Sequence, residues 1–251
     1  MSLPRLRLET CHFDTERNLW HISSDEAHHL VHVRRLYTGS LVEGLLCNVQ
    51  DSVTQKSGKK ILLKLLCDGD EVFAREIKQD DEVNIPELTL LLALLKADQW
   101  EDALRFAAQT GVTYIVPLIA ERSIPKISPN ELPKKMARWN KILGEATKQS
   151  SAVVPPNLAE PVAFANFDFA GLAELNKQKF VALLTDKTVS LRDVRFENAV
   201  VLAIGPEGDW SPKETKILLE NNFTPITLGN RILKASTAVA VGCGAISILR
   251  Q

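Results

Sequence analysis

Several features that would assign this chain to a class at once are scarce or missing. Its four cysteines, Cys11, Cys47, Cys67 and Cys243, are spread along the chain without a C-x-x-C pair, which argues against a zinc or redox motif. We interpret all four as buried free thiols. The N-terminus has no basic segment followed by an apolar stretch, so we expect no signal peptide. No apolar run approaches the length of about eighteen residues that spans a membrane. We therefore expect a cytoplasmic protein.

The chain also lacks a large net charge of either sign. Thirty Lys and Arg residues face thirty-one Asp and Glu residues, for a formal net charge of −1. A nucleic-acid partner would therefore require a local basic patch, because the chain as a whole offers no attractive field. With 251 residues, of which 45% are hydrophobic and 24% charged, the composition is that of a globular protein with one large domain or two small ones.

The first part of the chain has the pattern of a small β-barrel-like domain, which we assign to residues 1–80. Short apolar runs separated by turns predict strands at Leu41–Val49, Ile61–Cys67 and Val72–Ile77. The polar segment Asp51–Lys60 predicts a hairpin loop between the first two of them. The helical candidate in this part is Ser24–Leu36, with Ser24 as its cap.

The second part, residues 81–251, alternates strands with helices after a linker at about residues 78–87. The central segment of this linker, Asp80–Pro86, is acidic and ends in a proline. Strands are expected at Leu88–Leu95, Val112–Leu118, Phe180–Leu184, Val200–Ile204 and Ile226–Leu228, and helices at Asp98–Thr110, Lys134–Ser150, Pro212–Asn222 and Ser236–Leu249. This order predicts an α/β fold with a parallel sheet covered on both faces. Ser211, Pro212 and Glu214 stand in the order of a helix capping box.

Two glycine turns follow buried strands in this second part. Val200–Ile204 stops at Gly205-Pro206-Glu207-Gly208, and Ile226–Leu228 stops at Gly229. If the two strands lie side by side, their turns form a ligand crevice at the carboxyl edge of the sheet. Gly242 and Gly244 lie inside the last helix, where each costs about 1 kcal/mol relative to alanine. Close approach of another segment would explain them.

These motifs carry a family resemblance. IGPEG, LGNRIL and the following Thr237-Ala238 resemble the knotted, SPOUT-type RNA methyltransferases, and more narrowly the ribosomal RNA small-subunit methyltransferase E family. Members of that family methylate N3 of a uridine in 16S rRNA with S-adenosylmethionine (SAM). The match continues in order through His32-Val33-Arg34-Arg35, Gln109-Thr110-Gly111-Val112, Glu121-Arg122-Ser123 and Gln149-Ser150.

The resemblance implies both an architecture and a set of sites. It implies a trefoil-knotted domain at 81–251 after a PUA-like RNA-binding β-barrel at 1–80, in a homodimer that uses SAM and no metal. The implied cofactor-binding residues are Leu184, Thr185, Ile204, Gly205, Pro206, Glu207, Gly208, Leu228, Gly229, Ile232, Leu233, Thr237 and Ala238. The implied RNA contacts are Arg5, His32, Arg34, Arg35, Arg122 and Lys148.

Arg231 and Lys234 are the candidate catalytic residues, because uracil N3 must lose a proton and a nearby cation stabilises the developing anion. A salt bridge that fixes the turn is the alternative role for Arg231. Glu207 is either the base or, as we favour, an acceptor of backbone N–H bonds that holds its loop.

Two basic clusters fit either a contact with RNA or an ordinary solvated surface. His32, Arg34 and Arg35 fit phosphate contact better than a metal site at His28 and His32, but they also fit a solvated face. The Lys134–Ser150 helix, rich in lysine and arginine, either steers RNA or is simply solvated.

Three positions depart from the family pattern. Asp209 replaces a glycine, Ala152 an arginine and Ser236 a glutamate. Ser236 is still able to cap the last helix. These departures keep two further hypotheses open: an RNA- or ribosome-binding paralogue without activity, and a knotted methyltransferase with a different target nucleotide.

Overall fold

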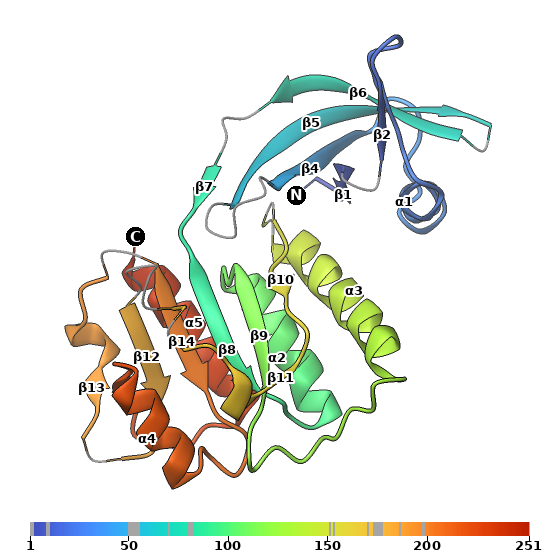
Figure 1. Ribbon diagram of the computed structural model, residues 1–251. Coiled ribbons are helices and arrows are strands. Elements are labelled where there is room, and N and C mark those ends of the chain that lie inside the picture. Colours follow the sequence, from blue (N-terminus) through green and yellow to red (C-terminus); the bar gives the residue numbers. More distant parts are fainter. Residues whose placement is uncertain are drawn as a thin grey trace. The chain divides into compact units, whose positions relative to one another are not determined.

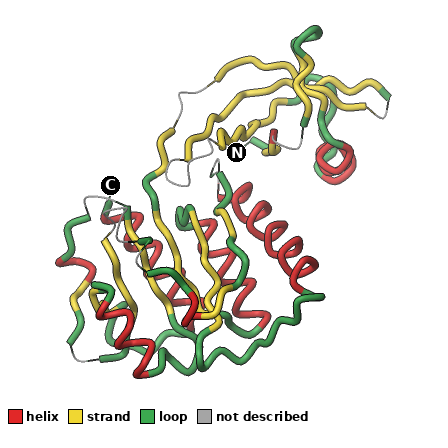
Figure 2. The backbone as a smooth tube through the Cα atoms, viewed as in Figure 1, coloured by secondary structure: helices red, strands yellow, loops and turns green. Residues whose placement is uncertain are grey.

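The computed structural model describes residues 3–8, 11–49, 56–69, 71–79, 83–150, 152, 154–169, 171–172, 178–185, 187–196 and 199–250. The chain forms two compact units, Met1–Ile85 and Pro86–Gln251. The division falls between Ile85 and Pro86, inside the segment that the sequence marks as a linker. Figures 1 and 2 show the elements of each unit.

The first unit is a mostly antiparallel sheet with one short helix. Its strands are β1 (Arg5–Arg7), β2 (His12–Asp14), β3 (Leu19–His21), β4 (Leu41–Val49), β5 (Lys56–Asp68), β6 (Glu71–Gln79) and β7 (Val83–Ile85). They lie in the order β1-β4-β5-β6-β3-β2, with β7 paired to β5 and β1 parallel to β4. Ile61, Leu63 and Leu65 are buried on alternate positions of β5, because successive side chains of a strand point to opposite faces. One face of the sheet therefore carries the core.

The structure differs in detail from four expectations for this unit, which concern a loop, the linker, a helix and the cap of that helix. Strand β5 begins at Lys56, so the predicted loop Asp51–Lys60 is shorter than expected; residues 51–55 lie outside the described part. The predicted linker contains a strand, β7, whose Val83–Ile85 pairs with Lys56–Gly58. The predicted helix Ser24–Leu36 is α1 (Ser24–His28), which continues as a π-helix over His29–Val33. Its cap position is Ser23, without a side-chain capping bond, because Ser24 already belongs to the helix.

The second unit is an α/β fold around a parallel sheet, as predicted. Its strands are β8 (Leu88–Ala93), β9 (Tyr114–Ile119), β10 (Asn157–Leu158), β11 (Val162–Ala163), β12 (Gln178–Ala182), β13 (Val189–Ser190), β14 (Val200–Ile204) and β15 (Thr224–Thr227). The order is β10-β9-β8-β14-β12-β15-β13, with β11 also paired to β9. The pairings are parallel.

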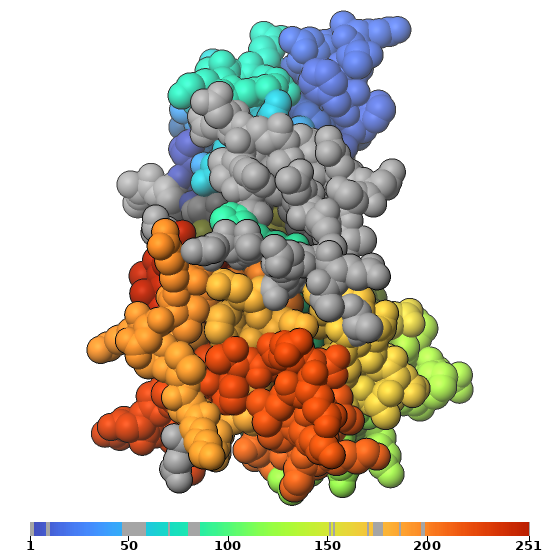
Figure 3. Space-filling model, turned by 60° about the vertical axis from the view of Figure 1, so that its left-hand side comes forward, coloured from blue at the N-terminus to red at the C-terminus, as the bar shows by residue number. Residues whose placement is uncertain are grey.

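Helices cover both faces of this sheet. α2 (Ala97–Gln109), α3 (Leu132–Ser150) and α5 (Ala235–Leu249) lie on one face, and α4 (Pro212–Glu220) lies on the other (Figure 1). The central strand β14 is buried at every position. Its Leu202 belongs to the core on the α2–α3–α5 side, and its neighbours Val201 and Ala203 belong to the core on the α4 side. In the space-filling view, the orange and red C-terminal segments cover much of the visible face of this unit (Figure 3).

The cap predicted from the sequence is observed at the start of α4 but not at the start of α5. At α4 the Ser211 hydroxyl accepts from the Glu214 N–H, and the Glu214 carboxylate accepts from the Ser211 N–H, which confirms the capping box. At α5 the predicted cap was wrong: Lys234 occupies the cap position, and Ser236 is buried inside the first turn. A Cβ at Gly242 would lie 2.9 Å from Leu202 Cδ2. The close approach to this glycine therefore includes strand β14.

Candidate active site

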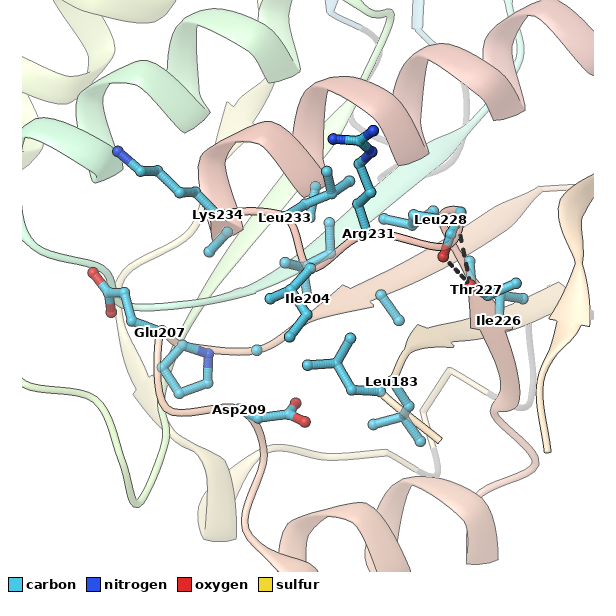
Figure 4. Close-up of a pocket in the computed structure, with 18 of the residues that line it drawn as sticks. Leu183, Ile204, Glu207, Asp209, Ile226, Thr227, Leu228, Arg231, Leu233 and Lys234 are labelled. Atoms are coloured by element: carbon cyan, nitrogen blue, oxygen red, sulfur yellow. Dashed lines mark hydrogen bonds between the residues drawn. The ribbon is translucent and has the colours of Figure 1, made fainter. Parts of the chain in front are cut away.

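A cavity of about 350 Å³ lies at the carboxyl ends of three neighbouring strands (Figure 4). Strand β12 pairs with β14 on one side and with β15 on the other. The two glycine turns therefore flank the end of β12 and do not lie directly beside each other. The cavity is lined by Gln99, Ala182, Leu183, Leu184, Ile204, Gly205, Pro206, Glu207, Asp209, Ile226, Thr227, Leu228, Gly229, Arg231, Ile232, Leu233, Lys234, Ala235 and Ala238.

The first glycine turn is fixed by contacts from distant parts of the unit. The Arg122 guanidinium donates to the Gly208 carbonyl at 2.8 Å, and the Lys96 N–H donates to Glu207 Oε1 at 3.2 Å. A Cβ at Gly205 would lie 3.1 Å from the Trp210 indole nitrogen. Trp210 thus packs so closely against the turn that a larger residue at position 205 would displace it.

A buried carboxylate ties the loops after β9 and β14 together. Glu214 is only 5% exposed. Its two oxygens accept the Ser211 N–H at 2.9 Å and the Glu121 N–H at 2.8 Å. Charged acceptors form the stronger class of hydrogen bond, so the same side chain that starts α4 also positions the loop carrying Arg122.

The second glycine turn follows β15. The Thr227 hydroxyl bonds both the carbonyl of Gly229, at 2.8 Å, and its N–H, at 3.3 Å (dashed lines in Figure 4). Gly229 has φ +119°, a region that side chains other than glycine rarely adopt. A Cβ there would meet no atom within 4 Å. The turn therefore leaves open space where any other residue would place a side chain.

Arg231 and Lys234 both line the cavity, and both side chains are exposed. Their charged ends point away from Leu183 and Asp209 (Figure 4). Arg231 forms no ion pair with any residue in the described ranges. A salt bridge that holds the turn thus finds no support in this geometry.

Most of the predicted cofactor-binding residues lie in the cavity wall. Those that do not are Thr185, Gly208 and Thr237. Sequence reasoning missed Gln99, Ala182, Leu183, Asp209, Ile226, Thr227 and Ala235. Gln99 lies in the first turn of α2, the helix that follows β8, and its Oε1 is buried without a hydrogen-bond partner among the described residues. The feature of the sequence that could have identified Gln99 as a site residue is its position just after a predicted strand, at the start of a predicted helix.

The predicted RNA contacts fall into two groups. His32, Arg34 and Arg35 are exposed on the first unit, and the His32 ring centroid lies 4.9 Å from that of His28. The other three have partners within the protein. Arg5 pairs with Glu43 at 2.7 Å, Lys148 lies 3.8 Å from Glu145, and Arg122 binds the first glycine turn.

The described residues include no group of three or more His, Cys, Asp and Glu side chains that could hold a metal ion. Nor does any helix in these ranges have the length and apolar character to cross a membrane. Of the cysteines, Cys243 is buried and free, whereas Cys11 and Cys67 are free and only partly buried, contrary to expectation. The side chain of Cys47 lies outside the described part.

The parallel sheet with a glycine-walled cavity at its carboxyl edge defines an α/β domain built to hold a small ligand. The RNA methyltransferase domain family matches residues 82–247 of this chain, and the chain belongs to that family. This confirms the resemblance read from the glycine turns.

Two relatives of this chain share the name ribosomal RNA small subunit methyltransferase E. The ribosomal RNA small subunit methyltransferase E of Synechocystis sp. is 31% identical over 193 residues, which cover 74% of this chain and 61% of that protein. The Bacillus subtilis protein of the same name is 27% identical over 237 residues, which cover 90% of this chain and 88% of that protein.

Two solved structures have the same fold. One, a ribosomal RNA small subunit methyltransferase E from Neisseria gonorrhoeae bound to SAM, has a TM-score of 0.79 at 23% identity and covers 98% of both chains. The other, described as a methyltransferase from Legionella pneumophila in complex with SAM, has a TM-score of 0.78 at 26% identity. That match covers 100% of this chain and 98% of the other.

Proposed function

We propose that this protein is a SAM-dependent methyltransferase that modifies N3 of a uridine in the 16S RNA of the small ribosomal subunit. The observation that carries the proposal is the cavity at the ends of β12, β14 and β15, walled by the two glycine turns. Membership in the RNA methyltransferase family and the names of the relatives support it. An enzyme for ribosomal RNA would work in the cytoplasm.

The cavity residues suit SAM. Backbone groups of the first turn at Gly205 and the Gly229 carbonyl, which has a second lone pair besides the one that the Thr227 hydroxyl uses, suit the edge of an adenine. Leu183, Ile226 and Leu228 supply apolar contact. The buried Gln99 Oε1 has no partner in the described part of the chain. It is therefore an acceptor for a donor group of the ligand, because buried polar atoms are otherwise satisfied. When bound, SAM supplies a methyl group on a sulfonium.

The chain's own contribution to the reaction is orientation and charge. Holding donor and acceptor in attack geometry accounts for a large share of the rate gain. We assign Arg231 to stabilise the uracil anion that forms when N3 loses its proton, with Lys234 as the second cation. The exposed Arg231 guanidinium forms no ion pair within the described ranges, so it is free to turn to a base that enters the cavity. Glu207 holds its turn through the Lys96 N–H, which favours that role over a role as base.

The first unit is the proposed PUA-like RNA-binding domain. Arg34 and Arg35 are exposed beside His32, and guanidinium groups pair bidentately with phosphate oxygens. Contacts of this kind position an RNA without reading its sequence. Arg5 is a weaker candidate than the sequence suggested, since Glu43 already neutralises it.

We further propose that the second unit is trefoil-knotted and forms a homodimer. α5 carries the exposed apolar residues Val241, Ile248 and Leu249. A groove beside the cavity has an apolar wall and also includes Ser190, Arg192 and Thr227; the apolar wall is formed by Leu191, Leu228, Val241, Ala245, Ile248 and Leu249. Exposed apolar patches of this kind mark interfaces. Ile232 at the cavity is 81% exposed, and a second subunit would cover it.

Methylation of small ribosomal subunits tests the function. The purified protein, SAM and subunits from cells that lack the modification should give one methylated uridine. Reverse transcription should stop there, because a methyl group on N3 blocks base pairing. A modified nucleotide of another kind would favour the different-target hypothesis. SAM binding without methyl transfer would require another substrate, and absence of SAM binding would favour the inactive RNA-binding paralogue.

A further inference from the structure

Asp209 places a carboxylate in the wall of the cavity. The residue has φ +60°, which aspartate tolerates better than most side chains. Its Oδ1 accepts the Trp210 N–H at 2.8 Å, which fixes the orientation of the group. In Figure 4 the carboxylate extends from the turn toward Leu183. Asp209 is one of the three positions at which the sequence departs from the pattern of the family that it resembles.

The other charged side chains of the cavity are placed differently. Glu207, Arg231 and Lys234 are exposed, whereas Asp209 is partly buried. The cationic ends of Arg231 and Lys234 point away from Asp209 (Figure 4). Solvent screens exposed charges most strongly. Asp209 therefore contributes the charge that a ligand inside this largely apolar cavity experiences most directly.

We propose that Asp209 makes the site selective for the charge of the cofactor. The inference rests on the proposed function, since it takes SAM as the ligand. SAM carries a positive sulfonium, whereas the product S-adenosylhomocysteine carries a neutral thioether. Asp209 belongs to the wall of this cavity of about 350 Å³, so its carboxylate acts on a bound ligand over distances on the order of the Debye length, roughly 8–10 Å. The carboxylate thus favours the methyl donor over the spent cofactor.

The test is the ratio of the affinities for SAM and for S-adenosylhomocysteine, measured by calorimetry on the full chain and on Asp209→Asn. Asparagine keeps the acceptor oxygen for the Trp210 N–H and tolerates the same φ, so the substitution removes mainly the charge. We expect the ratio to fall about tenfold at low ionic strength, chiefly through weaker SAM binding. Added salt should lower the ratio in the wild-type protein and leave that of the variant nearly unchanged.

Glu220→Gln is the matched control, because it removes one negative charge from the exposed end of α4, outside this cavity. Its ratio should equal that of the wild type. An unchanged ratio in Asp209→Asn, or equal losses of both affinities, would overturn the inference while leaving the methyltransferase intact. Failure of the wild type to bind SAM would instead contradict the proposed function. If Asp209→Asn does not fold, Asp209→Gly replaces it, because glycine adopts φ +60° without strain.

Discussion

Arg231 is the side chain on which the proposed chemistry depends most. We expect Arg231→Ala to lower the single-turnover rate of methyl transfer about 100-fold, because a cation that stabilises developing charge contributes mainly in the transition state. SAM affinity, measured by calorimetry, should change little. Lys234→Ala is the comparison, with a smaller expected loss. A normal rate in Arg231→Ala would remove Arg231 from the reaction.

Substitution of Arg122 tests whether this residue supports the cofactor site or contacts RNA. Its guanidinium holds the Gly208 carbonyl at 2.8 Å, so Arg122→Ala should loosen the first glycine turn. We expect SAM affinity to fall about tenfold even without RNA, since a hydrogen bond from a charged group contributes about 1.5–3 kcal/mol. An unchanged SAM affinity with weaker RNA binding would support the RNA contact that the resemblance implies.

Cys243 is an inert thiol. Burial raises its pKa to about 12, and the thiolate is the reactive form. Alkylation of the folded protein at pH 8 should therefore leave Cys243 unmodified, whereas the partly exposed Cys11 and Cys67 react. Peptide mass spectrometry after brief exposure to iodoacetamide measures this. Rapid labelling of Cys243 in the native protein would contradict its burial.

At the scale of elements, α5 offers a matched pair of glycines. A Cβ at Gly244 would lie 3.7 Å from Thr110 Cγ2, an ordinary contact, whereas one at Gly242 would lie 2.9 Å from the buried Leu202. Gly244→Ala should therefore stabilise the protein by about 0.5–1 kcal/mol through helix propensity. Gly242→Ala should destabilise it by about 1 kcal/mol, because overpacking outweighs that gain. Denaturant unfolding of both variants measures the difference, and equal effects would refute the close packing on β14.

The elements that follow from local sequence were those with strong local signals. β14 has the predicted bounds, Val200–Ile204, because a β-branched apolar run ends at a glycine turn. α4 begins as predicted because its capping box lies within four residues. The π-helical continuation of α1 and the start of α5 at Ala235 have no such signal. The packing around each helix set those bounds, and local patterns do not contain it.

At the scale of the whole molecule, the exposed apolar residues of α5 predict the interface of the proposed homodimer. Val241 is 41% and Ile248 71% exposed in the single chain. Val241→Arg and Ile248→Arg should each shift the protein from dimer to monomer, because a buried unpaired charge opposes association. Light scattering after gel filtration measures the mass. Leu219→Arg, at an exposed leucine of α4 away from this groove, should leave the dimer intact, and a wild-type monomer would contradict the proposal.

By itself, the sequence determined the α/β class and the parallel sheet, because strand and helix patterns and glycine turns lie within a few consecutive residues. The family came from the resemblance carried by its motifs, and SAM as the cofactor is the proposal that this resemblance supports. The tertiary structure alone decided that β12 lies between the two glycine turns. It also decided that Gln99 and Asp209 enter the cavity and that Arg122 turns to Gly208. The physical reason is that strand order and these contacts join residues far apart in the chain, so their geometry arises only when the sheet packs.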